Sequence, residues 1–246
     1  MNEIDIEKAA ALMRSASNMA VLTGAGVSKE SGIPTFRDAQ TGLWAKYDPQ
    51  QLASPEGFKN NPELVWQWYD MRRQNLANVQ PNAAHIAISA LESEFSEFAV
   101  LTQNVDGLHQ RAGSKHVVEL HGNITTFYCF DRLHPASEIP TGLKQPPVCH
   151  CGSLIRPAVV WFGEALDRSV WRSASQTAIG CEVMLVVGTS ALVQPAASLP
   201  FDAKQKGAKI IEINPEQTPL TRRADLFIQA PAAIAFPLLM QYFRQS

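Results

Sequence analysis

The sequence has few cysteines, almost no net charge and no long apolar run, and each shortage argues against a class of protein. Its four cysteines are too few and too clustered for a secreted disulfide scaffold, which indicates a reduced, cytoplasmic setting. A net charge of −2 does not favour binding to nucleic acid or to an anionic membrane, because both need a basic surface. No apolar run approaches the roughly 20 residues that span a bilayer. The polar and charged residues of Met1–Ala20 are unlike a signal peptide.

The composition and the order of apolar segments predict one globular enzyme domain over residues 1–246. With 46% hydrophobic and 18% charged residues, the chain is ordinary for such a domain. Short β-rich runs alternate with helix-compatible sequence, which predicts an α/β fold with a Rossmann-like, doubly wound parallel sheet. The expected strands are Met19–Thr23, Phe98–Thr102, Val183–Val187, Lys209–Ile213 and, as a further candidate, Leu226–Ile228. A first helix is expected at Ile4–Ser15, with Ile6, Ala9, Ala10 and Met13 on one face.

Two stretches break this alternation, and we expect both to be insertions at the edge of the sheet that together form a small subdomain. Residues 39–79 are aromatic and helical, and Asn61 followed by Pro62 is typical of a helix start. Residues 124–155 carry three of the four cysteines and suggest a zinc-ribbon-like module. Ligand-binding parts of α/β folds commonly lie in such positions.

A glycine-rich loop, Gly24-Ala25-Gly26-Val27-Ser28, follows the first expected strand. Glycines in such turns let backbone N–H groups approach a pyrophosphate, because no Cβ blocks the way. The dinucleotide fingerprint is incomplete, since Lys29 stands where its third glycine should be, and an ordinary tight turn is an equal alternative. The nearby Phe36 and Arg37 favour a ligand site over a core phenylalanine and a surface salt bridge, because arginine pairs with phosphate and an aromatic ring covers another ring.

A polar cluster, Gln103, Asn104 and Asp106, follows the second expected strand. A doubly wound fold places its chemistry at such strand ends, and an Asn–Asp pair can bind a carboxamide such as that of nicotinamide. Taken alone, this segment is better explained as an Asx turn. His121, followed by Gly122, has the side chain of a general base, although a single histidine is more often structural.

Taken together, these segments resemble the sirtuin family of NAD-dependent protein deacylases. The resemblance depends on many motifs in the same order, not on any one of them. The matching pieces are Gly24–Ser28, Gly32–Arg37, Thr102–Asp106, His121-Gly122, Arg156–Glu164, Gly188–Ser190 and Ile213–Pro215.

The resemblance implies an activity and a role for each motif. NAD is consumed: the acyl oxygen of a substrate lysine attacks the ribose, nicotinamide leaves, and His121 takes a proton from the ribose hydroxyls, giving free lysine and acyl-ADP-ribose. Acyl-lysine proteins or peptides are the expected partners, held by strand addition along Val160, Phe162 and Gly163. The residues implied in NAD binding are Gly24, Ala25, Gly26, Ser28, Phe36, Arg37, Gln103, Asn104, Asp106, Gly188, Thr189, Ser190, Asn214, Glu216 and Ala232. Because this route needs no covalent enzyme intermediate, Cys181 is expected to be a core thiol.

Three residues bear on the acyl group. Tyr69 and Arg72 lie three apart on the expected helix, so they share a face and can bind a carboxylate. In isolation a solvated arginine is the simpler explanation. Within the resemblance, this pair and the small Ala53 match the class III subgroup that removes succinyl and malonyl groups, so we expect both acetyl and acidic acyl groups to be substrates.

The cysteines depart from the family's usual zinc motif of two Cys-x-x-Cys pairs. Cys129 lacks the second cysteine of its pair, and Cys149 and Cys151 are separated by one residue instead of two. Three thiolates with one further ligand can still form a tetrahedral site, but a metal-free loop is equally consistent, and we expect weak or absent zinc. The fourth ligand is left open among His134, His150 and Asp131.

Three other activities use the same expected NAD site. Protein mono-ADP-ribosyl transfer shares the loss of nicotinamide. A non-catalytic NAD or ADP-ribose sensor would not need His121, Asn104 and Asp106. Hydride transfer is disfavoured by the missing third glycine.

Overall fold

The computed structural model describes residues 2–34 and 47–245, and its chain divides into two compact units. The first, which we call the sheet unit, comprises Met1–Thr35, Gln80–Leu120 and Asp167–Ser246. The second, the small unit, comprises Phe36–Val79 and His121–Leu166. Each unit is built from chain segments that are separated in the sequence, so neither can be read as one continuous stretch.

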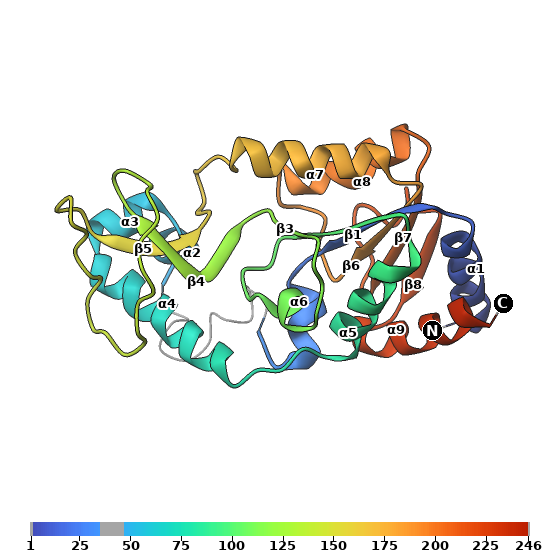
Figure 1. The fold of residues 1–246 in the computed structure, drawn as a ribbon, viewed down its shortest axis with the longest axis horizontal. Helices are drawn as coiled ribbons and strands as arrows, with labels where there is room; N and C mark the ends of the chain where they lie inside the picture. The colour runs from blue at the N-terminus through green and yellow to red at the C-terminus, as the bar shows by residue number, and fades with distance from the viewer. Residues whose placement is uncertain (1, 35–46, 246) are drawn as a thin grey trace. The chain divides into compact units, whose positions relative to one another are not determined.

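A six-stranded parallel sheet forms the centre of the sheet unit (Figure 1). Its order is β3-β2-β1-β6-β7-β8. The chain builds outward from β1 on one side and then returns to build outward from β6 on the other, so the order reverses between these two strands. This is the predicted doubly wound topology, and the prediction is confirmed. The strands are β1 (Asn18–Thr23), β2 (Glu97–Thr102), β3 (Val117–Glu119), β6 (Val183–Val187), β7 (Lys209–Asn214) and β8 (Leu226–Gln229).

Helices cover both faces of this sheet, and each face has its own buried apolar cluster (Figure 1). One face packs against α1 (Glu3–Arg14), α5 (Ala83–Leu91) and α9 (Ala232–Arg244), the other against α7 (Arg168–Gly180) and α8 (Leu199–Gln205). Because side chains alternate along a buried strand, each strand supplies apolar groups to both clusters. The predicted face of the first helix is confirmed, as its buried residues are Ile6, Ala9, Ala10 and Met13. Shorter elements are η1 (Ala25–Ser31), η3 (Glu92–Glu94), α6 (Leu108–Arg111) and η4 (Ala196–Ser198).

In the part of the small unit that the structure describes, three helices accompany a two-stranded antiparallel sheet. The helices are α2 (Pro49–Leu52), α3 (Pro55–Asn60) and α4 (Pro62–Ala77), and the strands are β4 (Gly122–Cys129) and β5 (Ile155–Val159). The predicted helix start is confirmed, because the Asn61 side chain accepts a 3.1 Å hydrogen bond from the backbone N–H of Leu64.

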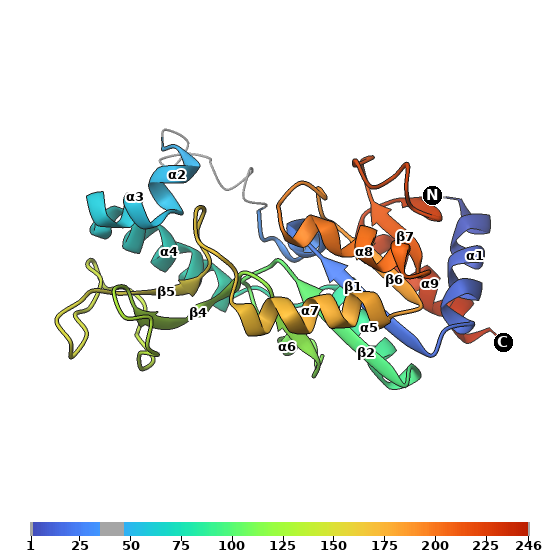
Figure 2. The same ribbon diagram turned by 90° about the horizontal axis from the view of Figure 1, so that it is seen from above.

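The pairing of β4 with β5 requires a glycine at its first position. Strands β4 and β5 lie side by side (Figure 2). Within this pair Gly122 lies opposite Val159 and has a φ of 76°. A Cβ on Gly122 would lie 2.0 Å from the carbonyl oxygen of Ala158, so any other residue would push the strands apart. These two strands were not among those predicted from the sequence.

No helix within the described ranges is both long and apolar enough to cross a membrane.

Candidate functional site

The loops that follow β1 and β6 pack backbone against backbone at the carboxyl end of the sheet. The N–H of Gly26 donates to the carbonyl of Gly188 at 2.8 Å, and a Cβ on Gly26 would lie 2.7 Å from that same oxygen. A Cβ on Gly24 would lie 2.8 Å from atoms of Gly188 and Thr189. These glycines therefore let two loops meet, and they do so where the strand order reverses, which is where doubly wound sheets bind ligands.

Ser28 joins the loop after β1 to the polar cluster after β2. Its hydroxyl donates to Oδ2 of Asp106 at 2.7 Å and accepts from Nδ2 of Asn104 at 3.1 Å. All three side chains are buried. The structure thus brings together two of the predicted motifs, and the Asx turn is present as well, since the N–H of Leu108 donates to Oδ1 of Asp106 at 3.0 Å.

His85, on α5, completes the surroundings of Ser28 and was not singled out from the sequence. Its Nδ1 accepts the backbone N–H of Asn82 at 3.3 Å, so Nε2 carries the proton and faces the Ser28 hydroxyl at 3.4 Å. Burial lowers the pKa of His85 to about 4, against an opposing effect of Asp106. A neutral His85 fits this arrangement, because protonated Nδ1 would face another donor. In the sequence, His85 stands three residues after the cap residue Asn82. That spacing indicates a helix start, but it does not predict the contact with Ser28.

His109, on α6, lies beneath the ends of β1 and β2. Its Nε2 lies 3.0 Å from Oγ1 of Thr23, whose hydroxyl donates to Oγ1 of Thr102 at 2.8 Å. Burial, together with the neighbouring His85, lowers the pKa of His109 to about 3. Among the described residues, its buried Nδ1 has no hydrogen-bond partner. The His109 ring is therefore neutral, and it is buried beside the hydroxyls of Thr23 and Thr102.

Two further predicted residues, Gln103 and Asn214, contact a third, Thr189, which follows β6. Nε2 of Gln103 donates to Oγ1 of Thr189 at 2.9 Å, and Nδ2 of Asn214 donates to the Thr189 carbonyl at 2.8 Å. The carboxyl ends of β2, β6 and β7 are thereby tied together. Of the other residues predicted to contact NAD, Ser190 and Glu216 are exposed to solvent. Ala232 is buried at the start of α9. Phe36 and Arg37 lie outside the described residues.

In the small unit, His121 immediately precedes β4, and its carbonyl accepts the N–H of Val160 at 2.9 Å. The side chain of His121 is half-buried. The strand pairing therefore fixes His121 beside the Val160–Glu164 segment. In that segment Phe162 and Gly163 are exposed, and the N–H of Phe162 donates to the carbonyl of Ala53 at 2.9 Å.

Tyr69 and Arg72 lie on α4 in the same unit. Oη of Tyr69 accepts from Nε1 of Trp161 at 2.9 Å, and burial raises the pKa of Tyr69 to about 12, so it remains a phenol. The guanidinium carbon of Arg72 lies 4.7 Å from the Trp68 ring centre and 5.8 Å from that of Tyr69. The neighbouring Arg73 is buried, pairs with Asp70 at 3.3 Å and donates to the Ile139 carbonyl.

A buried ion pair closes the turn after β5. Arg156 is fully buried and donates to both carboxylate oxygens of Glu164, at 2.5 and 3.0 Å. Its guanidinium carbon lies 3.2 Å from the ring centre of Trp161, whose backbone N–H also binds Glu164 at 2.8 Å. Sequence reasoning included these residues only as parts of a matching motif and assigned them no pairing.

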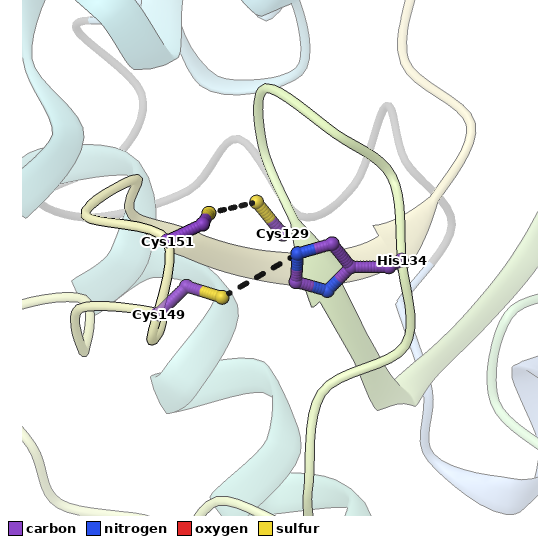
Figure 3. A group of neighbouring side chains, drawn as sticks. All are labelled: Cys129, His134, Cys149 and Cys151. Carbon is purple, nitrogen blue, oxygen red and sulfur yellow. Dashed lines mark hydrogen bonds between the residues drawn. The ribbon is translucent and has the colours of Figure 1, made fainter.

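Three of the four cysteines converge with a histidine in the small unit. The ligand atoms of Cys129, His134, Cys149 and Cys151 all lie within 4.8 Å of one another (Figure 3). Of the three candidates for a fourth ligand, His134 is the one in this group. Cys181 is buried in the sheet unit, where its thiol donates to the Ala178 carbonyl at 3.2 Å, and burial raises its pKa to about 11, as expected for a core thiol.

Comparison with known proteins finds relatives that match most of this chain. Residues 24–195 match the model of the Sir2 family. A protein of Aquifex aeolicus named NAD-dependent protein deacylase is 50% identical over 230 residues, covering 93% of this chain and 96% of that protein. The solved structure of a Sir2 homologue–NAD complex matches with a TM-score of 0.90 and 45% identity, over 96% of this chain and 93% of that one. A Sir2–p53 peptide–NAD⁺ structure matches with a TM-score of 0.83 and 32% identity, over 95% and 96% of the two chains.

Proposed function

The chain belongs to the Sir2 family, and we propose that it is an NAD-dependent enzyme that removes acyl groups from lysine side chains of proteins, forming nicotinamide and O-acyl-ADP-ribose. The family resemblance drawn from the sequence is thereby confirmed. The name of the Aquifex relative and the NAD and peptide complexes of the structural relatives support this activity over ADP-ribosyl transfer to protein, ligand sensing or hydride transfer.

One observation carries the proposal: Asn104 and Asp106 are buried at the carboxyl end of β2 and held there by Ser28. An amide beside a carboxylate offers a donor and an acceptor for a carboxamide. Ser28 uses its one proton and both its acceptor positions within the protein, so we assign it to positioning this pair and not to a nucleophilic attack. The residues present thus fit the nicotinamide end of NAD.

The remaining NAD contacts are assigned to the loops around the β1–β6 reversal. Gln103 and Asn214, both held by Thr189, would bind the riboses, and Gly188 and Ser190 would lie along the phosphates. Glu216 and Ala232 would serve the adenosine end, and Gly24, Ala25 and Gly26 would form the loop beside it. When bound, NAD supplies a ribose carbon with a good leaving group and so becomes the acceptor of the acyl group.

The small unit would supply the base and the peptide site. His121 would take a proton from a ribose hydroxyl, with its backbone fixed by Val160. The exposed segment containing Phe162 and Gly163 would pair with the backbone of an extended substrate peptide.

We further assign an acidic acyl preference to the wall formed by Ala53, Tyr69 and Arg72. Tyr69 accepts from Trp161 and remains a phenol, whose O–H is a donor, and Arg72 lies against the ring of Tyr69, so a carboxylate would meet a phenol and a guanidinium. The backbone contact between Ala53 and Phe162 places a small side chain beside the proposed peptide segment. Succinyl- and malonyl-lysine fit this wall, in addition to acetyl-lysine.

The test is to incubate the protein with NAD and an acyl-lysine peptide and to follow all products by mass. Deacylation gives acyl-ADP-ribose and nicotinamide in equal amounts. A gain in protein mass, reduced cofactor or unchanged NAD would each overturn the proposal. Asp106→Asn should reduce nicotinamide formation at least about tenfold through loss of a charged hydrogen bond, whereas Glu97→Gln, at the opposite end of β2, should leave it unchanged.

A further inference from the structure

We propose that Cys129, His134, Cys149 and Cys151 form a Cys3His zinc site in the small unit, with His134 as the fourth ligand. The usual pair of Cys-x-x-Cys motifs is absent from this sequence, so neither the number of ligands nor their identity follows from the family pattern. The proposal depends on where the structure places the four side chains, which all approach within 4.8 Å of one another (Figure 3).

The distances between the ligand atoms suit a tetrahedral zinc ion. Bonds of about 2.3 Å to sulfur and about 2.0 Å to nitrogen give ligand-to-ligand distances of roughly 3.5 to 3.8 Å in a tetrahedron. The Sγ atoms of Cys129 and Cys151 are 3.4 Å apart, and Sγ of Cys149 lies 3.7 Å from Nε2 of His134. Three sulfurs and one imidazole nitrogen are also a donor set that zinc uses in structural sites.

His134 follows Cys129 at a longer spacing than the second cysteine of a Cys-x-x-Cys motif would. The turn between Cys129 and His134 explains how its side chain still reaches the thiol of Cys129. The N–H of Cys129 donates to the carbonyl of His134, and the N–H of Leu133 donates to the carbonyl of Cys129, both at 2.9 Å. Leu133 closes this turn with a φ of 54°, which a leucine rarely adopts. The strained turn directs His134 back toward Cys129.

A second closed turn places the other two thiols. The N–H of Cys149 donates to the carbonyl of Ser153 at 2.7 Å, and the N–H of Gly152 donates to the carbonyl of Cys149 at 2.9 Å. Gly152 has a φ of 86°, a conformation that suits glycine. The short Cys149-His150-Cys151 spacing therefore still directs both sulfurs to the cluster. The irregular spacing on which we based an expectation of weak zinc binding does not keep the four ligand atoms apart.

His134 is favoured over the two alternatives by its orientation. Its Nε2 faces the sulfurs, while its Nδ1 lies 3.5 Å from the carbonyl of Pro135, the kind of backbone partner that orients a metal-bound histidine. His150 is exposed and stacks on His134 with ring centres 4.9 Å apart. Its Nδ1 lies 3.6 Å from Sγ of Cys149, but neither His150 nor Asp131 belongs to the group whose ligand atoms all lie within 4.8 Å of one another.

A bound zinc ion would stabilise the part of the small unit around β4 and β5, whose own apolar cluster is small. That buried cluster contains Trp66, Phe127 and Ile155, with Cys129 and Cys149 completing it. Two of the proposed ligands thus belong to the core that holds β4 and β5 against α4. A small core of this kind commonly depends on a metal for its stability.

The experiment measures metal content and ligand type, not enzyme activity. Protein purified without added metal or chelator is analysed for zinc, and the metal-free protein is titrated with Co²⁺, whose thiolate charge-transfer absorption rises with the number of bound thiolates. We expect one zinc per chain. His134→Ala should weaken Co²⁺ binding by at least about 100-fold, since even residues outside the ligand shell can cost 10–100-fold.

Two further variants make the test decisive. His134→Cys should bind Co²⁺ with charge-transfer absorption about one-third stronger, because four thiolates replace three, which distinguishes a ligand from a merely structural histidine. His150→Ala, the matched control, should bind as the natural protein does. Zinc below one-tenth of an equivalent with no Co²⁺ binding, metal loss in His150→Ala but not in His134→Ala, or a Cys129–Cys151 disulfide in the reduced-purified protein would each overturn the proposal.

Discussion

The guanidinium of Arg156 binds both carboxylate oxygens of Glu164 while its face lies against the ring of Trp161. Arg156 is fully buried, and Glu164, whose carboxylate remains partly open to solvent, is its charge partner. The pair spans the turn that carries the proposed peptide segment. The conformation of the peptide segment therefore depends on the carboxylate of Glu164.

Replacing Glu164 by glutamine should therefore weaken both stability and peptide binding. The change leaves a buried guanidinium without its counter-charge, and we expect the free energy of unfolding to fall by roughly 2–3 kcal/mol, less than for a fully buried pair because the Glu164 side chain is 23% exposed. Urea unfolding followed by tryptophan fluorescence measures the loss, and the KM for peptide should rise. Glu138→Gln, an exposed carboxylate of the same unit, should change neither, and equal effects of the two variants would contradict the assignment.

Arg72→Met should separate acidic from neutral acyl groups. Loss of a charge-assisted hydrogen bond of about 1.5–3 kcal/mol predicts a fall of roughly 10- to 100-fold in kcat/KM for succinyl peptide, with a much smaller change for acetyl peptide. Initial rates on two peptides that differ only in the acyl group measure this. Equal losses on both would contradict a carboxylate-binding role.

The neighbouring Arg73 is not a neutral control for that experiment. It is buried, pairs with Asp70 and lies over the Phe127 ring, so its removal would disturb the fold of α4. Arg172→Met is the better match, because Arg172 is an exposed helical arginine of α7. Its kinetic constants should equal those of the natural protein on both peptides.

His121→Asn should slow deacylation by about 10²- to 10⁴-fold, the usual contribution of a general base. A base that acts on a ribose hydroxyl is needed to form the acylated product but not for the departure of nicotinamide. Exchange of labelled nicotinamide into NAD in the presence of acyl peptide should therefore persist. Loss of exchange together with turnover would place His121 in an earlier step, and the exposed His116 provides the control variant His116→Asn.

Acid should destabilise the sheet unit through its two buried histidines. Their pKa values are lowered in the folded protein to about 4 for His85 and about 3 for His109, below the value of about 6.5 for an unfolded histidine. The unfolded chain therefore takes up protons first as pH falls, and stability declines from about pH 6.5 down toward the folded pKa values. Each histidine contributes up to about 1.4 kcal/mol per pH unit.

Hydrogen exchange of peptides from β1 and β2 between pH 7 and pH 5 measures this decline in the sheet unit alone. We expect a loss of roughly 2–4 kcal/mol over that range. In His109→Gln the slope should be about half as steep, whereas the exposed His116→Gln should keep it. A flat profile in the natural protein would show that these rings are not buried in their neutral form.

The sequence predicted local and repeated features well. The five expected strands and the first helix are present with ends within one residue of the expected ones, because continuous apolar runs and a helical stripe are local signals. The three-residue strand β3 was missed. The strands β4 and β5 were also missed, since the pairing of Gly122 with Val159 joins distant segments and is stabilised by the small unit's own core.

The candidate site was predicted as a set of motifs but not as a network. The sequence marks Ser28, Asn104 and Asp106, but it does not show that one hydroxyl connects them or that His85 completes the group. Likewise, the cysteine spacing left three candidates for a fourth ligand, whereas the folded chain brings the ring of His134, and neither His150 nor Asp131, into the four-residue group. Such contacts depend on tertiary packing, which motif spacing does not encode.

The contact between the two glycine loops sets a limit on protein engineering. A side chain on Gly188 would lie 2.4 Å from the backbone nitrogen of Val27, just as side chains on Gly24 or Gly26 would meet Gly188. Libraries that randomise either loop alone would therefore yield mostly misfolded variants, whatever their intended cofactor. Attempts to alter dinucleotide choice should keep all three glycines fixed and vary the exposed positions around them.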